Sequence, residues 1–215
     1  MKFMIAPEGW PFVVVFALLA IATGVVLRPW LSIFPVLLLC FMLFFFRDPE
    51  RMVPQDAGVF VSPADGEVVL VKEVYEDRYL KADTVMISVF MSPFNVHVNR
   101  APMDGVVLDV VHVPGKFMAA FKEEASLANE HINMVMEGDL GRILVRQVAG
   151  FLARRAVCRV KPGDQLKRGE RYGVIKFGSR LDIYLPKGTS ISVAVNDRVT
   201  AGETILGAVN LRNKG

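Results

Sequence analysis

The sequence predicts a mainly β fold, a flattened β-sandwich, behind an N-terminal pair of apolar helices. Apolar residues make up 53% of the 215-residue chain, which is more than a soluble domain needs. The excess lies between Pro11 and Phe46, where Arg28 is the only charged residue. From Arg47 onward, short β-branched runs alternate with Gly, Pro, Asp and Asn, a pattern typical of strands joined by turns. We therefore expect an apolar anchor at 1–46 and a β domain at 47–215.

The apolar region divides at Arg28-Pro29-Trp30 into 11–27 and 31–46. Each part is close to the shortest length that crosses a bilayer as a helix, so a two-pass helical hairpin is favoured. A pair of helices lying in the membrane interface and one long tilted span remain open alternatives. No small-residue cleavage site follows a short apolar core, so the region is not expected to be removed as a signal peptide.

Charged residues and cysteines bear on location and partners. Lys2, Arg47 and Arg51 flank the apolar region, which predicts attachment to the cell membrane with the domain on the cytoplasmic side. The two cysteines, Cys40 and Cys158, provide no disulfide framework and fit a reducing compartment. The net charge of +3 suits an anionic lipid surface, but solvated Lys and Arg side chains explain so small an excess equally well. We see no nucleic-acid signature and no cluster of metal ligands, and expect neither partner.

Six runs in the β domain are expected to form strands. They are Val68–Val71, Val85–Phe90, Gly105–Val113, Ile143–Val148, Ala156–Val160 and Ile191–Val195. The one stretch with helical spacing is 116–128, which forms either a helix or a lip of the domain.

An internal repeat supports a sandwich of two similar halves. Residues 163–170 and 196–203 each place Asp and Gly five positions apart around one apolar residue, which predicts two related turns that lead into strands. The first of these, with the apolar strand after Gly169, resembles the biotinyl and lipoyl carrier domains. In those domains a hairpin presents a lysine for modification, and the matching position here is Ser179. We therefore expect Ser179 at a hairpin tip, with chemistry that differs from that of a carrier.

Gly178-Ser179 is the only Gly-Ser pair in the chain. On its own, such a pair is most simply a turn. A serine that follows glycine in a strained turn can also attack the preceding carbonyl and convert the amide to an ester. Elimination then breaks the chain, and hydrolysis with loss of ammonia leaves a pyruvoyl group.

Five segments, in order, resemble the phosphatidylserine decarboxylase family in its short, pyruvoyl-dependent proenzyme form. They are Phe46–Pro49, Ser62–Gly66, Met91–Arg100, Pro114–Phe117 and Phe177–Arg180. The resemblance extends over nearly all of the chain from Arg47 to the end.

The resemblance implies a carboxy-lyase that converts phosphatidylserine in the membrane to phosphatidylethanolamine through a Schiff base. The precursor would cut itself between Gly178 and Ser179 into a beta chain, 1–178, and an alpha chain, 179–215. These chains would remain together as a heterodimer, with higher oligomers possible. The cofactor would be a covalent pyruvoyl group derived from Ser179, with no pyridoxal phosphate and no metal.

The resemblance also assigns the site residues. Asp65 and His97 would act with Ser179 in cleavage, where an imidazole takes the hydroxyl proton and a carboxylate orients the imidazole. Without the family, Asp65 is most simply a turn residue and His97 a polar residue at a strand end. Longer members carry two histidines three apart in this segment. Here Arg100 stands in the second place, which leaves open how cleavage and decarboxylation are divided.

Three residues are expected to bind substrate: Arg100, Lys116 and Phe117. We also expect the segment 116–121 to touch the membrane beside the site. His112 and His131 are expected to be surface or strand-edge residues.

Two other functions remain as alternatives. One is a non-enzymatic, membrane-tethered biotinyl-like adaptor or carrier that never cleaves, against which the missing tip lysine argues. The other is a pyruvoyl enzyme for a soluble amino acid, against which the apolar anchor argues.

Overall fold

The computed structural model describes residues 4–116, 129–150, 156–176 and 179–209. The chain divides into two compact units, Met1–Glu50 and Arg51–Gly215. The expected helix at 116–128 lies outside the described residues, except for Lys116.

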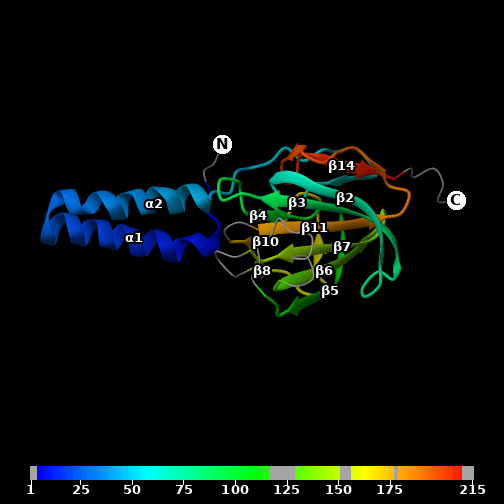
Figure 1. The fold of residues 1–215 in the computed structure, drawn as a ribbon, viewed down its shortest axis with the longest axis horizontal. Coiled ribbons are helices and arrows are strands. Elements are labelled where there is room, and N and C mark those ends of the chain that lie inside the picture. The colour runs from blue at the N-terminus through cyan, green and yellow to red at the C-terminus, as the bar shows by residue number, and fades with distance from the viewer. Residues whose placement is uncertain (1–3, 117–128, 151–155, 177–178, 210–215) are drawn as a thin grey trace. The chain divides into compact units, whose positions relative to one another are not determined.

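The first unit contains the two expected helices, α1 (Trp10–Ala22) and α2 (Ile33–Phe45), which are drawn in blue in Figure 1. Short helical turns extend α1, so that Pro7–Leu27 forms one apolar helix of 21 residues. By length and composition this helix can cross a membrane, whereas the second apolar helix, Pro29–Phe45, is shorter. Arg28 is extended between the two, because the proline that follows disfavours a helical conformation.

Aromatic stacking joins the two ends of the first unit. The rings of Phe12 and Phe46 are stacked with centroids 5.6 Å apart. A Cβ atom added to Gly9 would lie 2.5 Å from the Cβ atom of Phe46, so the glycine allows the close approach. The two helices also contact each other.

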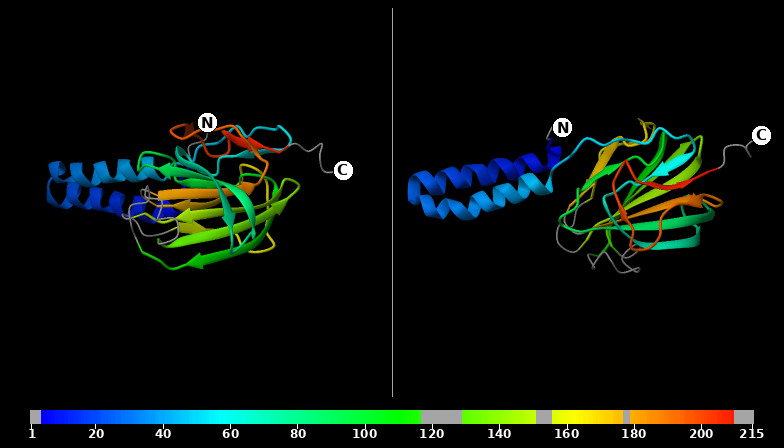
Figure 2. Two further views of the ribbon diagram at one scale, coloured as in Figure 1. Left: turned by 45° about the vertical axis from the view of Figure 1, so that its right-hand side comes forward. Right: turned by 90° about the horizontal axis from the view of Figure 1, so that it is seen from above.

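The second unit is built from fourteen strands in three sheets within its described residues. The largest sheet has eight strands in the order β13-β2-β3-β11-β7-β6-β5-β9, and the two smaller ones are β1-β14-β12 and β4-β10-β8. Figure 2 shows how the large sheet curls around the interior of the unit. The strands are β1 (Val59–Val61), β2 (Gly66–Glu76), β3 (Ala82–Met91), β4 (Val98–Arg100), β5 (Gly105–Val113), β6 (His131–Gly138), β7 (Gly141–Val148), β8 (Ala156–Cys158), β9 (Gln165–Leu166), β10 (Arg171–Ile175), β11 (Ser179–Pro186), β12 (Ser190–Ile191), β13 (Arg198–Val199) and β14 (Ile205–Ala208).

The prediction of a mainly β fold behind two apolar helices is confirmed. All six runs expected as strands overlap strands. The run Ala156–Val160 is a strand only to Cys158, and the run Ile191–Val195 is a strand only at Ile191, the last residue of β12. The core lies on one face of the large sheet, where alternate residues of each strand point inward. Its members include Ile87, Val89, Met91, Met134, Ile143, Val145, Leu181, Ile183 and Leu185.

The predicted pair of related turns is also confirmed. The backbone N–H of Val107 donates to the carbonyl of Asp164 at 2.9 Å, and that of Val68 donates to the carbonyl of Asp197 at 2.9 Å. Each turn is thus bound to the strand of its own half in the same way.

A second repeat becomes visible in the structure. Ser62-Pro63-Ala64-Asp65-Gly66 and Ala101-Pro102-Met103-Asp104-Gly105 lead into β2 and β5. The Oδ1 atom of Asp65 accepts a hydrogen bond from the Ala201 N–H at 2.8 Å, and that of Asp104 accepts from the Arg168 N–H at 2.9 Å. The two aspartates therefore hold equivalent places in the two halves.

The face of the large sheet opposite the core carries a buried ion pair. The Nε atom of Arg180 lies 2.6 Å from Oδ1 of Asp182, and both side chains are almost fully buried. Arg180 also donates from Nη2 to Oγ of Ser88 at 2.8 Å. Removing one partner of a buried ion pair strongly destabilises a fold, because the other charge stays buried without compensation.

We expect Asp182→Asn to lower the free energy of unfolding by about 3–5 kcal/mol, because Arg180 would keep its charge in a buried place. Urea unfolding of the full chain in detergent measures this. The matched control is Glu137→Gln, which breaks the half-exposed pair between Glu137 and Arg142 and should cost less than about 1 kcal/mol. Equal losses in the two variants would contradict the expectation.

Candidate active site at the start of strand β11

Ser179 is the first residue of β11, a central strand of the large sheet, and its side chain is fully buried. The preceding strand, β10, belongs to the three-stranded sheet β4-β10-β8. The expectation of a hairpin with Ser179 at its tip is therefore wrong, because the chain passes between two sheets at this point. Gly178 lies outside the described residues.

The register of the strands places three of the segments that resemble the family, those containing Asp65, Met91 and Ser179, at one end of the large sheet. Glu67 of β2 pairs with Phe90 of β3, and Phe90 pairs with Arg180 of β11. Because the strands are antiparallel, Asp65, Met91 and Ser179 all lie on the same side of this row, at the end of the sheet. The approach is close, because a Cβ atom on Gly66 would lie 2.1 Å from the carbonyl oxygen of Phe90.

The Ser179 hydroxyl points at a sulfur atom. Its Oγ atom lies 3.6 Å from Sδ of Met91, directly across the strand pair. The same sulfur is 3.9 Å from Nδ2 of Asn99 on β4. Asn99 is thus brought to Ser179 by the segment that also contains His97.

His97 stands just before β4 with 1% of its surface exposed. A tight turn precedes it, in which Oδ1 of Asn95 accepts from the N–H and the hydroxyl of Ser92 at 2.8 and 2.7 Å. The carbonyl of His97 accepts from the Ile175 N–H at 3.2 Å. His97 is therefore tied to the end of β10, close in sequence to Ser179.

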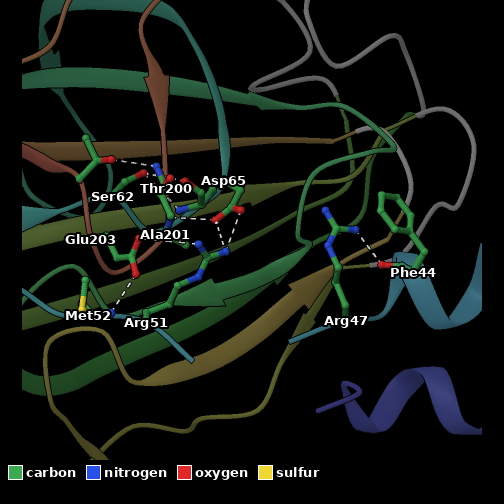
Figure 3. Close-up of polar contacts among 11 residues, drawn as sticks. Phe44, Arg47, Arg51, Met52, Ser62, Asp65, Thr200, Ala201 and Glu203 are labelled. Atoms are coloured by element: carbon green, nitrogen blue, oxygen red, sulfur yellow. Dashed lines mark hydrogen bonds and ion pairs between the residues drawn. The ribbon is translucent and has the colours of Figure 1, made fainter. Parts of the chain in front are cut away.

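Asp65 is bound from two sides, as Figure 3 shows. Nη2 of Arg51 donates to its two carboxylate oxygens at 2.8 and 3.0 Å, and the Ala201 N–H donates to Oδ1. Arg51 also lies 3.9 Å from Glu203, whose carboxylate accepts from the Met52 N–H at 2.8 Å. The segment just after the anchor thereby fixes the position of Asp65.

Two of the three residues expected to bind substrate can be placed. Arg100 is buried, and its Nη1 atom donates to the carbonyl of Gly169 at 2.9 Å, while its N–H donates to the carbonyl of Pro63 at 3.0 Å. Lys116 is exposed and pairs with Asn129 in an isolated bridge. Phe117 lies outside the described residues.

The remaining histidines differ from each other. His112 is exposed on β5 and lies 3.1 Å from Glu130, as expected of a surface residue. His131 lies on β6, inside the sheet, and is buried, so the expectation of a surface position is wrong for it. Burial lowers the pKa of His131 below its usual value, and the positive charge of Arg146 acts in the same direction. A neutral imidazole is therefore favoured there.

Other reactive side chains in the interior are held in their neutral forms. Burial raises the pKa of the Cys158 thiol, and burial with the nearby Cys158 raises the pKa of Tyr172 well above its usual value. Neither side chain is thus poised as a nucleophile. Within the described ranges, no group of three or more His, Cys, Asp or Glu side chains is arranged to hold a metal ion.

A cleft of about 330 Å³ opens at the same end of the sheet. Glu67 and Phe90, from the aligned row, form part of its wall, and Phe94 and Asn95 from the turn before His97 form another part.

Sequence reasoning missed three residues in this region. Arg51 appears in the sequence only as a flanking charge, although it binds Asp65. Asn99 and Gln147 form a buried pair near Ser179, with Nε2 of Gln147 donating to Oδ1 of Asn99 at 2.8 Å. Asn99 falls within the segment Met91–Arg100, which assigns it no role, and no motif contains Gln147. The partners of both amides are far away in the chain.

Comparison with known proteins connects this geometry to a family. The family described as phosphatidylserine decarboxylase matches residues 38–207. Three similar curated proteins are each named phosphatidylserine decarboxylase proenzyme. That of Citrifermentans bemidjiense is 49% identical over 94% of this chain and 95% of its own length. Those of Geotalea uraniireducens and Nitrosomonas europaea are each 45% identical over 94% of this chain, and over 95% and 94% of their own lengths.

The matched range contains Asp65, His97 and Ser179. Asp65 and Ser179 lie at one end of the large sheet, and His97 is hydrogen-bonded to Ile175 at the end of β10. The chain belongs to the phosphatidylserine decarboxylase family.

Proposed function

We propose that this protein decarboxylates phosphatidylserine to phosphatidylethanolamine, after cutting itself between Gly178 and Ser179. Family membership supports the reaction, and the word proenzyme in the names of its relatives supports a processed precursor. The observation that carries the proposal is the position of Ser179, buried at the start of a central strand and aligned with the other family segments.

The cut can be written with all atoms conserved. The Ser179 oxygen loses its proton and bonds to the carbonyl carbon of Gly178, while the Gly178–Ser179 amide bond breaks and its nitrogen takes up the proton. A base then removes the α-proton of residue 179 as the Cβ–Oγ bond breaks, which frees Gly178 as a carboxylate. Water replaces the nitrogen, which leaves as ammonia, and residue 179 becomes the pyruvoyl group.

The surroundings of residue 179 fit this group. A ketone and a methyl group occupy little more space than a serine side chain, and the site offers the apolar thioether of Met91 and the amide of Asn99. The pyruvoyl group would supply a carbonyl that condenses with the substrate amine and accepts the electrons released as carbon dioxide leaves. His97, buried close to the end of β10, is the residue we assign to carry protons.

Asp65 and Arg51 would orient the cleavage machinery. Hydrogen bonds from Arg51 and from the Ala201 N–H fix the position and orientation of the Asp65 carboxylate. A positioned carboxylate that stabilises an imidazolium is a general device for activating a hydroxyl.

The remaining parts of the proposal concern location and assembly. The apolar helix Pro7–Leu27 supports attachment to the membrane in which the substrate resides. We place the second unit on the cytoplasmic side, with fragments 1–178 and 179–215 held together as a heterodimer by the pairing of β11 with β3 and β7. Arg100, Lys116 and Phe117 remain candidates for contact with the lipid headgroup.

Mass analysis under denaturing conditions tests the cut. We expect the parent to give two fragments divided after residue 178, the smaller with a blocked pyruvoyl end that reacts with a carbonyl reagent. Ser179→Ala should stay whole, because it has no hydroxyl to attack. An active preparation with an unbroken link and an unmodified Ser179 would refute the proposal, and an uncut, inactive parent would favour the adaptor. Turnover of vesicle phosphatidylserine against free serine separates the lipid enzyme from one that acts on a soluble amino acid.

The repeated turns provide a matched test of Asp65. Asp65→Asn keeps Oδ1 as an acceptor for the Ala201 N–H but removes the charge, and we expect self-cleavage to become at least about 100-fold slower. Asp104→Asn makes the same change in the equivalent turn, and its cleavage rate should match that of the parent. The fraction cut against time, read by mass, measures both. Equal rates for the two variants would show that Asp65 only supports its turn.

A further inference from the structure

Two buried amides, Asn99 and Gln147, lie beside Ser179 without a place in the cleavage scheme above. Both side chains are at most 1% exposed. Gln147 pairs with Leu181 on β11, and Ser179 is two residues before Leu181, so Gln147 and Ser179 are diagonal neighbours on one face of the sheet. Diagonal neighbours across a strand pair are within reach of long side chains.

Hydrogen bonds determine which way each amide points. A backbone carbonyl can only accept, so the carbonyl of Val157, 3.3 Å away, takes an N–H of Gln147. The Nε2 atom of Gln147 also donates to Oδ1 of Asn99 at 2.8 Å. Because Oδ1 is used in this way, Nδ2 of Asn99 is left facing the sulfur of Met91, which the Ser179 hydroxyl also approaches.

A glycine makes room for this arrangement. Gly173 on β10 pairs with Asn99 on one side and with Cys158 on the other. A Cβ atom at Gly173 would lie 2.4 Å from the carbonyl oxygen of Val157 and 2.8 Å from Nε2 of Gln147. The backbone thus leaves open the space in which the amide of Gln147 is held.

The Nδ2 donor of Asn99 makes only a weak contact, with the sulfur atom of Met91. Its Nδ2 atom is 3.9 Å from the sulfur of Met91, the atom that the Ser179 hydroxyl also approaches. Thioether sulfur is a weak acceptor, so an oxygen that gains negative charge nearby would replace it readily. Within the described part of the chain, Oε1 of Gln147 is buried without a donor, an unusual cost for an amide that served only packing.

We propose that Asn99 is a catalytic residue of self-cleavage, whose Nδ2–H donates to the oxygen that becomes negative when the 178–179 link is attacked, and that Gln147 is the positioning residue that orients it. The inference rests on the proposed function, because it requires Ser179 to open the chain. A fixed donor directed at a developing negative charge stabilises the transition state without first having to reorganise.

The test follows precursor made by cell-free translation, with the fraction cut read by mass at intervals between pH 5 and pH 8. We expect Asn99→Leu to be cut about 100-fold more slowly than the parent, the usual effect of losing one such donor. Asn99→Asp should be equally slow at pH 8, because a carboxylate has no donor. Its rate relative to the parent should recover as the pH falls, since the protonated carboxyl regains an O–H while its carbonyl still accepts from Gln147.

Asn133 supplies the matched control. It is buried to the same degree on the opposite face of the sheet and also makes two side-chain bonds, to Arg146 at 2.8 Å and to Tyr79 at 3.1 Å. Asn133→Asp should be cut at the parental rate at every pH.

Each other outcome overturns the inference. A parental rate for Asn99→Asp at pH 8 would show that only the bond to Gln147 matters. A rate that stays low at every pH, or the same recovery in Asn133→Asp, would show general damage from a buried carboxyl. If the parent itself is never cut, the proposed function fails instead, and the variants then have no rate to compare.

Discussion

The pairing of β11 with both of its neighbours is the constraint on which the rest of the structure depends. β11 lies between β3, which pairs with residues 179–186, and β7, which pairs with residues 180–184. Backbone pairing of this kind does not need an intact link before Ser179, so the strand can be cut at its start and stay in place. The same register aligns Glu67, Phe90 and Arg180, and so decides which loops meet beside residue 179.

The alternation of side chains along β11 also places Ser179 and the buried ion pair on opposite faces of the sheet. Ser179 points to the core face with Leu181, where it contacts Met91. Met91 in turn contacts Asn99, and Asn99 is hydrogen-bonded to Gln147. Arg180 and Asp182 point to the other face and form a buried ion pair there. Since successive side chains of a strand point to opposite faces, the charged pair and Ser179 are kept apart although they are neighbours in the chain.

The two halves of the domain are similar, and the candidate site lies where they differ. Asp65 and Asp104 each accept a backbone N–H in equivalent turns. Only the first is also ion-paired among the described residues, through Arg51 from the segment that follows the anchor. The two turns thus share a backbone hydrogen bond and differ in the charge that lies beside their aspartates.

Local periodicity and short ordered segments were enough to predict the two-part organisation, the positions of most strands, the paired turns and the family. The sequence indicated Ser179, Asp65 and His97 through resemblance. Only the tertiary structure decided that Ser179 begins a central strand, that His131 is buried, and that Arg51, Asn99 and Gln147 lie at the site. Those facts depend on register and on hydrogen bonds between residues far apart in the chain, such as Asn99 and Gln147, and no local pattern encodes such a pairing.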